Sequence, residues 1–190
     1  AKLGTPVSNF EAGENYKEVD DPSVVVALEL DDDPRCSLLV WTTTPWTLPA
    51  NQAVSLHAEI DYALVYSVIA AEYLVVAVDL VAEVLERAGI TDGQTISVIK
   101  GGSLEHLLLQ HPLYARKVPI ILAEHVSTEA GTGCVHTAPA HGPDDFVVCK
   151  KYGIEVENPV LANGCFGPQV ELFAGQHVAK VDQHIIDILA

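Results

Sequence analysis

Short runs of β-branched and apolar residues recur along the chain, and they limit its fold more than any other feature. Each run is bounded by Gly, Pro, Asn, Asp or Ser, which is the pattern of a strand between turns. The predicted strands cover residues 23–30, 36–41, 53–56, 62–69, 73–78, 95–100, 117–123 and 125–126. The first two of these runs flank an Asp-Asp-Asp-Pro turn and are expected to form a hairpin.

Helical spacing of apolar residues is confined to a few stretches. The predicted helices cover residues 79–89, 144–152 and 176–189, with a helical turn at 103–109. Asp79 is expected to cap the first helix and Gly89 to end it, while Ser103 caps the turn. The elements do not alternate as strand–helix–strand units, so a parallel doubly wound sheet is not expected. We predict a β-rich α+β fold, an antiparallel β-barrel-like domain with peripheral helices.

The domain organisation follows from length and composition. Residues 1–22 mix Gly, Asn, Pro and charged residues and are expected to be a flexible lead-in, which leaves 23–190 as one domain. The sequence contains no methionine, so we expect an excised piece of a larger protein. There is no apolar run of membrane-spanning length and no signal peptide, and the four cysteines are scattered, so we expect a cytoplasmic protein without membrane contact.

The charge restricts the possible partners. The formal net charge is −16, and so acidic a surface repels nucleic-acid backbones. If the domain handles a polynucleotide, it meets only one end of it, and most of the affinity comes from elsewhere.

Three consecutive threonines follow the strand at 36–41 and precede two prolines. The residues before Pro45 and Pro49 are held in extended geometry, so the stretch is predicted to be a stiff, extended loop that carries hydroxyl groups. Such a loop can line a polar pocket with little entropy left to lose on binding. A strand end with threonines chosen for β-propensity explains the local residues equally well.

A second stretch, residues 131–146, concentrates glycine, histidine and aspartate. His136 is expected near a strand end, and the small Ala138 leaves room for a ligand. Asp144 and Asp145 open a predicted helix, where a carboxylate is favoured by the helix dipole. One of the two aspartates is expected to cap the helix, and the other is free to meet an amino group.

Three interpretations of this stretch compete. A metal could be bound by His136, His141 and Asp145, although their spacing matches no motif with a mechanistic reason. The histidines and aspartates could be structural, pinning turns and capping the helix. They could also face the threonine loop across a small-molecule pocket, which explains both unusual loops together.

The two stretches together resemble the editing (CP1) domain inserted in isoleucyl-tRNA synthetases. The residues that carry the resemblance are Trp-Thr-Thr-Thr-Pro-Trp-Thr-Leu-Pro-Ala-Asn (41–51) and Gly-Thr-Gly-Cys-Val-His-Thr-Ala-Pro-Ala-His-Gly-Pro-Asp-Asp-Phe (131–146). The related valyl and leucyl domains carry Thr-Thr-Arg-Pro, then an acidic residue and Thr. Here Thr44 stands in place of the arginine and Trp46 in place of the acid, which indicates the isoleucyl branch.

The resemblance implies a role for each matching residue. Thr42, Thr43 and Thr44 would bind the terminal adenosine and surround the scissile ester, and Asn51 would support the loop or the adenosine. His136 would limit the side-chain pocket, and Asp145 would hold the substrate's ammonium group. The implied catalytic set is Thr42, Thr43, His136 and Asp145, and the implied substrate-binding set is Thr42, Thr43, Thr44, Trp46, Asn51, His136, Ala138 and Asp145.

The implied function is hydrolytic proofreading of valyl-tRNA(Ile), with valyl-adenylate as a further substrate. Water would attack the ester without metal or cofactor in this domain; ATP, and any zinc, would belong to the rest of the full-length synthetase. The implied partners are the 3′ end of charged tRNA(Ile), the valine moiety and the remainder of the synthetase chain. A metal-dependent hydrolase and a free-standing deacylase remain as alternatives.

Overall fold

The computed structural model describes residues 23–190, and the lead-in predicted for residues 1–22 lies outside the described residues. Within this range the strands are β1 (Val24–Glu29), β2 (Cys36–Thr42), β3 (Ala53–Leu56), β4 (Asp61–Ser67), β5 (Glu72–Ala77), β6 (Gln94–Lys100), β7 (Leu108–Gln110), β8 (Lys117–Leu122) and β9 (Val135–Thr137). The α-helices are α2 (Val81–Arg87), α3 (Pro143–Lys151) and α4 (Asp182–Leu189). The 3₁₀ turns are η1 (Pro45–Ala50), η2 (Val78–Leu80), η3 (Gly101–Leu104) and η4 (Val178–Lys180).

The centre of the fold is β2, which is buried along nearly its whole length. The predicted hairpin with β1 is confirmed, and its antiparallel register runs from Val24↔Thr42 to Glu29↔Ser37. Along β1 the buried residues alternate with exposed ones, as expected for a strand with one solvated face. The turn between the strands is held by Arg35, whose Nε donates to Asp33 Oδ1 over 3.0 Å.

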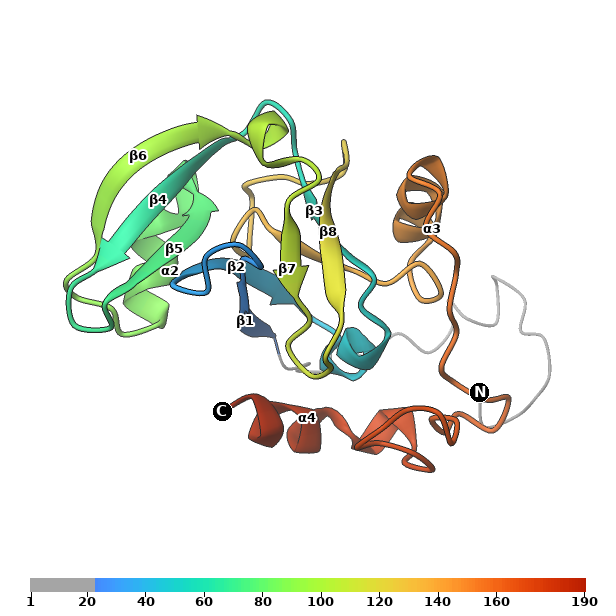
Figure 1. The fold of residues 1–190 in the computed structure, drawn as a ribbon. Coiled ribbons are helices and arrows are strands. Elements are labelled where there is room, and N and C mark those ends of the chain that lie inside the picture. Colours follow the sequence, from blue (N-terminus) through green and yellow to red (C-terminus); the bar gives the residue numbers. More distant parts are fainter. Residues whose placement is uncertain (1–22) are drawn as a thin grey trace, which may run out of the picture.

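The second edge of β2 has two successive partners, and both are parallel. β5 pairs with the start of β2, and β9 pairs with its end through Trp41↔Val135. β9 is antiparallel to β3, β3 is parallel to β8, and β8 is antiparallel to β7. The sheet then curls back on itself, because Leu109 of β7 forms a bridge with Leu30 just after β1 (Figure 1).

The β-rich, barrel-like class predicted from the sequence is therefore confirmed, although the sheet is mixed rather than purely antiparallel. The parallel pairs arise from long excursions of the chain. β9 enters the sheet only after the segment 123–134 and inserts between β2 and β3. The sequence of the three residues of β9 contains no pattern that predicts its place between β2 and β3.

Three antiparallel strands, with β4 paired to β5 on one edge and to β6 on the other, extend the sheet on one side, with α2 beside them (Figure 1). The predicted helix at 79–89 divides here into η2 and the shorter α2, and Asp79 caps neither. Val84 and Leu85 of α2 join the main hydrophobic core.

A smaller cluster of apolar side chains fixes α3 on the sheet. Val148 and Cys149 of α3 pack with Ala53 of β3, Ile121 of β8 and the nearby Val126. This packing places the first turn of α3 beside the end of β9, which is where the second sequence motif runs. Within residues 23–190, no helix has the length and apolar character needed to cross a membrane.

Three predicted elements differ in the structure. The helical turn expected at 103–109 is η3 followed by β7, because β7 pairs with β8 through Leu109↔Val118. Residues 125–126 form no strand, although Val126 is buried in the cluster under α3. The helix expected at 176–189 is reduced to η4 and α4, because His177 is extended and its Nδ1 accepts a hydrogen bond from Ala179 N.

Candidate active site

Residues 42–51, here called the threonine segment, leave the end of β2 and return to the sheet at β3. Thr44 has φ −130° and ψ 71°, outside the α-helical region that the following proline disfavours. The prediction of an extended loop is wrong beyond that point, since residues 45–50 form the 3₁₀ turn η1. Pro45 favours this turn because its φ is already helical and its missing N–H would have no partner in the first turn.

Three hydroxyl groups of the threonine segment, those of Thr42, Thr44 and Thr47, bond to one another. Thr42 Oγ1 accepts the Thr44 N–H at 3.1 Å and lies 3.4 Å from Thr44 Oγ1. Thr44 Oγ1 lies 3.1 Å from Thr47 Oγ1, and Thr47 Oγ1 donates to the Thr44 carbonyl over 2.8 Å. The side chains are thus aligned before any ligand arrives.

His136 lies beneath this segment because β9 inserts between the strand that enters the segment and the strand that leaves it. Val54 of β3 is its antiparallel partner, and Trp41 of β2 pairs with the preceding residue. The imidazole is buried, with Nε2 2.8 Å from Thr47 Oγ1 and Nδ1 2.7 Å from Asn51 Nδ2.

The hydrogen bonds of Asn51 determine which nitrogen of His136 carries the proton. Asn51 Nδ2 also donates to the Ala53 carbonyl over 2.9 Å, and a carbonyl can only accept, so the amide orientation follows from its partners. The second N–H of Asn51 then points at Nδ1 of His136, which must accept. His136 is therefore the neutral Nε2–H tautomer and donates to Thr47. Burial lowers its pKa to about 3, and the charge of His141 acts in the same direction.

Asp145 lies in the first turn of α3 and is half-buried. Its Oδ2 accepts the Ala138 N–H at 2.8 Å, whereas no hydrogen bond among the described residues reaches its Oδ1. Burial raises the pKa of Asp145, and the bond from Ala138 offsets part of that effect. The expectation that one aspartate caps the helix is wrong, because the N-cap is Gly142 and no side chain bonds there.

Gly142 is needed for this position of the carboxylate. A Cβ atom on Gly142 would lie 2.9 Å from both Cγ and Oδ2 of Asp145. Such a contact requires the aspartate side chain to move.

A cavity of about 220 Å³ joins the two motifs. Its lining consists of Trp41, Thr42, Thr43, Thr44, Trp46, Thr47, Val135, His136, Ala138, His141, Gly142 and Asp145. All but one of the predicted site residues line it. The exception is Asn51, which is buried behind His136 and acts on the cavity through that ring.

Sequence reasoning missed Thr47 as a site residue. Its position three residues after Thr44, in a turn begun by proline, was a weak signal for their contact. A larger hollow of about 540 Å³ lies between β1 and α4, but its lining is mostly apolar and includes neither motif. The smaller cavity is the better candidate because it gathers the polar groups of both motifs.

Trp46 and His141 form one wall of the cavity. Their rings meet edge to face, with centroids 4.9 Å apart and planes at 67°. The backbone N–H of Trp46 donates to Asp182 Oδ1 of α4 over 2.8 Å, which connects this wall to the C-terminal helix. Burial lowers the pKa of His141, and its Nε2 has no hydrogen-bond partner among the described residues.

The metal site considered for His136, His141 and Asp145 receives no support from the geometry. Both nitrogens of His136 are already occupied by Thr47 and Asn51. Within residues 23–190, no three His, Cys, Asp or Glu side chains are grouped as metal ligands would be.

The fold is shared with solved domains of leucyl-tRNA synthetases. The crystal structure of GlLeuRS-CP1 superposes with a TM-score of 0.70 at 19% identity and covers 88% of this chain and 95% of that one. The P. knowlesi cytosolic leucyl-tRNA synthetase editing domain gives a TM-score of 0.64 at 13% identity, covering 87% and 93%. At these identities the likeness concerns the fold alone.

Sequence comparison identifies the family. The family model described as "Leucyl-tRNA synthetase, editing domain" matches residues 23–174. The isoleucine–tRNA ligase of Legionella pneumophila (strain Corby) is 49% identical over 193 residues, which cover 95% of this chain and 20% of the relative. That of Saccharophagus degradans is 54% identical over 153 residues, which cover 80% and 16%. The chain spans about a fifth of the length of these relatives. It belongs to the editing-domain family of aminoacyl-tRNA synthetases, in the branch whose relatives are isoleucine–tRNA ligases.

Proposed function

We propose that this domain hydrolyses the ester of valyl-tRNA(Ile), and valyl-adenylate as a second substrate, and that it spares isoleucyl-tRNA(Ile). The observation that carries the proposal is the cavity in which the threonine hydroxyls, the neutral His136 and the half-buried Asp145 meet. The partners that follow are the 3′ end of the charged tRNA and the remainder of a synthetase chain.

Asp145 is proposed to hold the α-ammonium group of the amino acid through Oδ1. Its other oxygen is held by Ala138 N, so the carboxylate is oriented before the substrate binds. Burial raises its pKa, and an ammonium ion at hydrogen-bond distance would lower it again. A charge-assisted bond in this half-buried position is worth more than one in water.

The volume of the cavity supports a division of the substrate between two regions. About 220 Å³ is less than the ~300–1,000 Å³ of pockets for drug-sized ligands. It suits the amino-acid moiety and the ester, whereas the adenosine would rest on Thr43 and Thr44, which are exposed at the rim.

Size also explains the proposed selectivity. Valine lacks one methylene of isoleucine, and a pocket that binds isoleucine gains only about 1–3 kcal/mol against valine, a limit for which isoleucyl-tRNA synthetases are the standard example. A second, smaller pocket selects in the opposite sense, because it admits valine and excludes isoleucine by steric clash. His136 suits that wall, since Thr47 and Asn51 hold its ring from both sides.

The proposed reaction is direct attack by water on the ester carbonyl carbon. The bond to the ribose oxygen breaks, the ribose recovers its hydroxyl, and valine leaves as the free acid. Thr42 and Thr43 would orient the ester, and a ribose hydroxyl would help to position the water. His136 acts as a wall rather than as a base, because its Nδ1 lone pair already accepts from Asn51.

A covalent route through cysteine is not proposed, because no cysteine is among the residues that line the cavity. Cys134 and Cys149 are buried, and burial raises the pKa of both thiols, that of Cys149 to about 11. A buried thiol at neutral pH is a poor nucleophile.

The test is deacylation of valyl-tRNA(Ile) by Asp145→Asn and Asp145→Ala variants. Loss of a hydrogen bond to a charged group, worth about 1.5–3 kcal/mol, should lower kcat/KM by about 10–100-fold. Asp144→Asn is the matched control, because Asp144 is the exposed neighbour in the same helical turn and does not line the cavity. A wild-type rate in Asp145→Asn would remove this residue from the proposed role.

A chelator separates the proposal from the metal-dependent alternative. The rate should be unchanged after treatment with EDTA. Loss of activity that zinc restores would favour the metal-dependent hydrolase instead.

A further inference from the structure

We propose that Arg116 and Asp182 are positioning residues that hold the two ends of η1 and thereby fix the threonine segment and His136. The structural part of this inference stands on the contacts below, and its catalytic consequences rest on the proposed function. Neither residue lies in the two sequence motifs, and neither lines the cavity.

Arg116 holds the carboxyl end of η1. Its Nη2 donates to the Asn51 carbonyl over 2.7 Å and to the Pro49 carbonyl over 3.2 Å. These carbonyls lie at the end of the turn, where partners within the helix are missing. A planar guanidinium can satisfy both at once.

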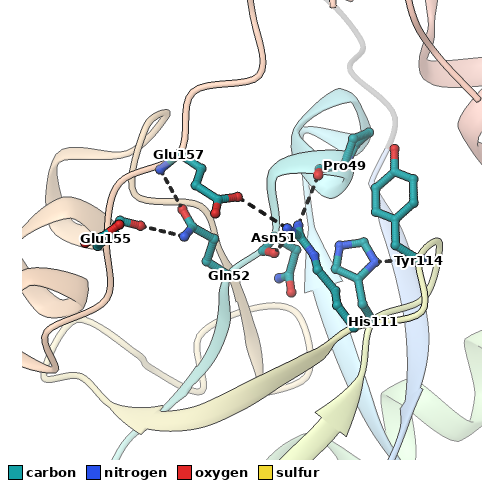
Figure 2. Close-up of polar contacts among 8 residues, drawn as sticks. Pro49, Asn51, Gln52, His111, Tyr114, Glu155 and Glu157 are labelled. Carbon is teal, nitrogen blue, oxygen red and sulfur yellow. Dashed lines mark hydrogen bonds and ion pairs between the residues drawn. The ribbon is translucent and has the colours of Figure 1, made fainter. Parts of the chain in front are cut away.

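Contacts on its other side orient the guanidinium. Nη1 lies 3.4 Å from Glu157 Oε2, and the guanidinium carbon lies 5.7 Å from the centroid of the Tyr114 ring. The side chain is about one-third exposed, at 35%. Figure 2 shows Pro49, Asn51 and Glu157 converging on this point.

Gln52 makes a second connection at the same place. Its Nε2 donates to the Glu155 carbonyl over 2.6 Å, and its Oε1 accepts the Glu157 N–H at 3.1 Å (Figure 2). The end of the threonine segment is therefore attached at two places. Arg116 connects it to the start of β8, and Gln52 connects it to the residues that follow α3, the helix that contains Asp145.

Asp182 holds the amino end of η1. Its Oδ1 accepts the Trp46 N–H at 2.8 Å across 136 residues of sequence. The first N–H groups of a helical turn have no partner within the turn, and a carboxylate suits the positive end of its dipole. Opposite charges therefore act on opposite ends of η1, a negative one at its start and a positive one at its end.

The connection to His136 runs through Asn51. Arg116 fixes the backbone carbonyl of Asn51, and the side chain of the same residue donates to Nδ1 of His136 over 2.7 Å. If the backbone of Asn51 shifts, the amide can no longer face both Ala53 and His136. The histidine then loses the bond that selects its tautomer and its position in the wall of the cavity.

The experiment uses Arg116→Gln and Arg116→Lys, with Arg87→Gln as the matched control. Arg87 is an exposed arginine of α2 paired with Glu83 of the same helix. We measure kcat/KM for valyl-tRNA(Ile) and isoleucyl-tRNA(Ile), the thermal midpoint, and the ¹⁵N-histidine NMR spectrum, in which His136 is assigned by its loss in His136→Asn.

Arg116→Gln should lower kcat/KM for the valyl ester about tenfold, the loss expected for a charge-assisted hydrogen bond. It should also narrow the preference for the valyl over the isoleucyl ester and shift the His136 nitrogen signals toward mixed tautomers. Each change should be smaller in Arg116→Lys, because the lysine ammonium keeps the positive charge but lacks the planar group that contacts both carbonyls and Glu157. If Arg116→Gln does not fold, the lysine variant makes the same test.

A second pair of variants tests the amino end. Asp182→Ala should lower kcat/KM for the valyl ester, and Asp182→Asn should recover most of the rate, because the amide oxygen can still accept from Trp46 N. Equal rates in the two variants would overturn the role assigned to Asp182.

An unchanged His136 spectrum and an unchanged preference for the valyl ester in Arg116→Gln would overturn the role of Arg116, even if the thermal midpoint falls. Failure of the proposed function is distinguishable from this result. In that case the wild-type chain itself would not hydrolyse valyl-tRNA(Ile), while the NMR spectrum would still report whether Arg116 controls the tautomer of His136.

Discussion

The side-chain amide of Asn51 donates to Nδ1 of His136 over 2.7 Å, and this bond decides how the histidine can take part in the site. A proton on Nδ1 would face an N–H group of Asn51 at that distance. For Asn51 to accept a hydrogen bond from Nδ1, its amide would have to turn its oxygen toward the ring and lose the hydrogen bond to the Ala53 carbonyl. The ring is therefore a fixed neutral group whose shape and position matter more than its basicity.

The protonation state of His136 can be followed directly. Because burial lowers its pKa to about 3, its ring should stay in the neutral Nε2–H form between pH 7.5 and pH 4.5. The ¹⁵N-histidine NMR spectrum should show its signals unchanged over this range. A titration midpoint near pH 6.5 would contradict the hydrogen-bond assignment.

The pH dependence of stability gives a second prediction. His111 is also buried, and desolvation, followed by the charge of Arg116, lowers its pKa to about 3. Below pH 6.5, His111 and His136 bind protons in the unfolded chain but stay neutral in the folded chain. The free energy of unfolding should therefore fall as the pH decreases from 7 toward 3, by about 2 kcal/mol per histidine at pH 5.

The contribution of His111 can be isolated by substitution. His111→Asn keeps an acceptor for the N–H groups of Leu113 and Tyr114, which now bond to Nδ1. Its urea-unfolding free energy should decrease less between pH 7 and pH 5 than that of the wild type. His106→Asn, at a side chain that is 71% exposed, is the control. Equal slopes in His111→Asn and the wild type would refute the assignment.

Gly142→Ala tests the placement of Asp145 without touching its charge. The new Cβ would lie 2.9 Å from the carboxylate carbon, so the side chain must shift from the position in which it accepts from Ala138 N. Deacylation of valyl-tRNA(Ile) should fall about tenfold or more, as for loss of a charge-assisted contact. Gly102→Ala is the control, because its nearest neighbour would be an ordinary 3.5 Å away. Equal rates in both variants would show that the carboxylate position is unimportant.

Removal of the His136 side chain should change specificity. His136→Ala enlarges the cavity at its inner wall, so isoleucyl-tRNA(Ile) should become a substrate, with a rate within about tenfold of that for the valyl ester. The measurement is release of each labelled amino acid from tRNA(Ile). If isoleucine stays bound to the tRNA, His136 is not the group that excludes it.

Affinity for tRNA should be weak in this chain. Its net charge of −16 opposes contact with phosphates, so the dissociation constant at physiological salt should be above about 1 µM. Filter binding or fluorescence anisotropy with tRNA(Ile) measures it. A sub-micromolar constant would mean that a local basic surface outweighs the overall charge.

The walls of the cavity were predictable because their residues occur in two dense motifs. Thr42, Thr43, Thr44, His136 and Asp145 were all expected there, and all line the same cavity. Their meeting depends on β9, whose three residues insert between β2 and β3.

The groups that hold the walls were not predictable. Arg116 acts on a carbonyl 65 residues away, and Asp182 acts on an N–H 136 residues away, so neither has a local pattern. The same limit explains the errors in the fold. Residues 108–110 form a strand because β8 lies beside them, although their own spacing also suits a helical turn.

The most direct test of the account is the release of valine and of isoleucine from tRNA(Ile) by the wild-type chain under identical conditions. The account predicts that valine is released at least tenfold faster than isoleucine, and that Asp145→Asn lowers the valine rate by about 10–100-fold. Equal release of the two amino acids, or faster release of isoleucine, would contradict it.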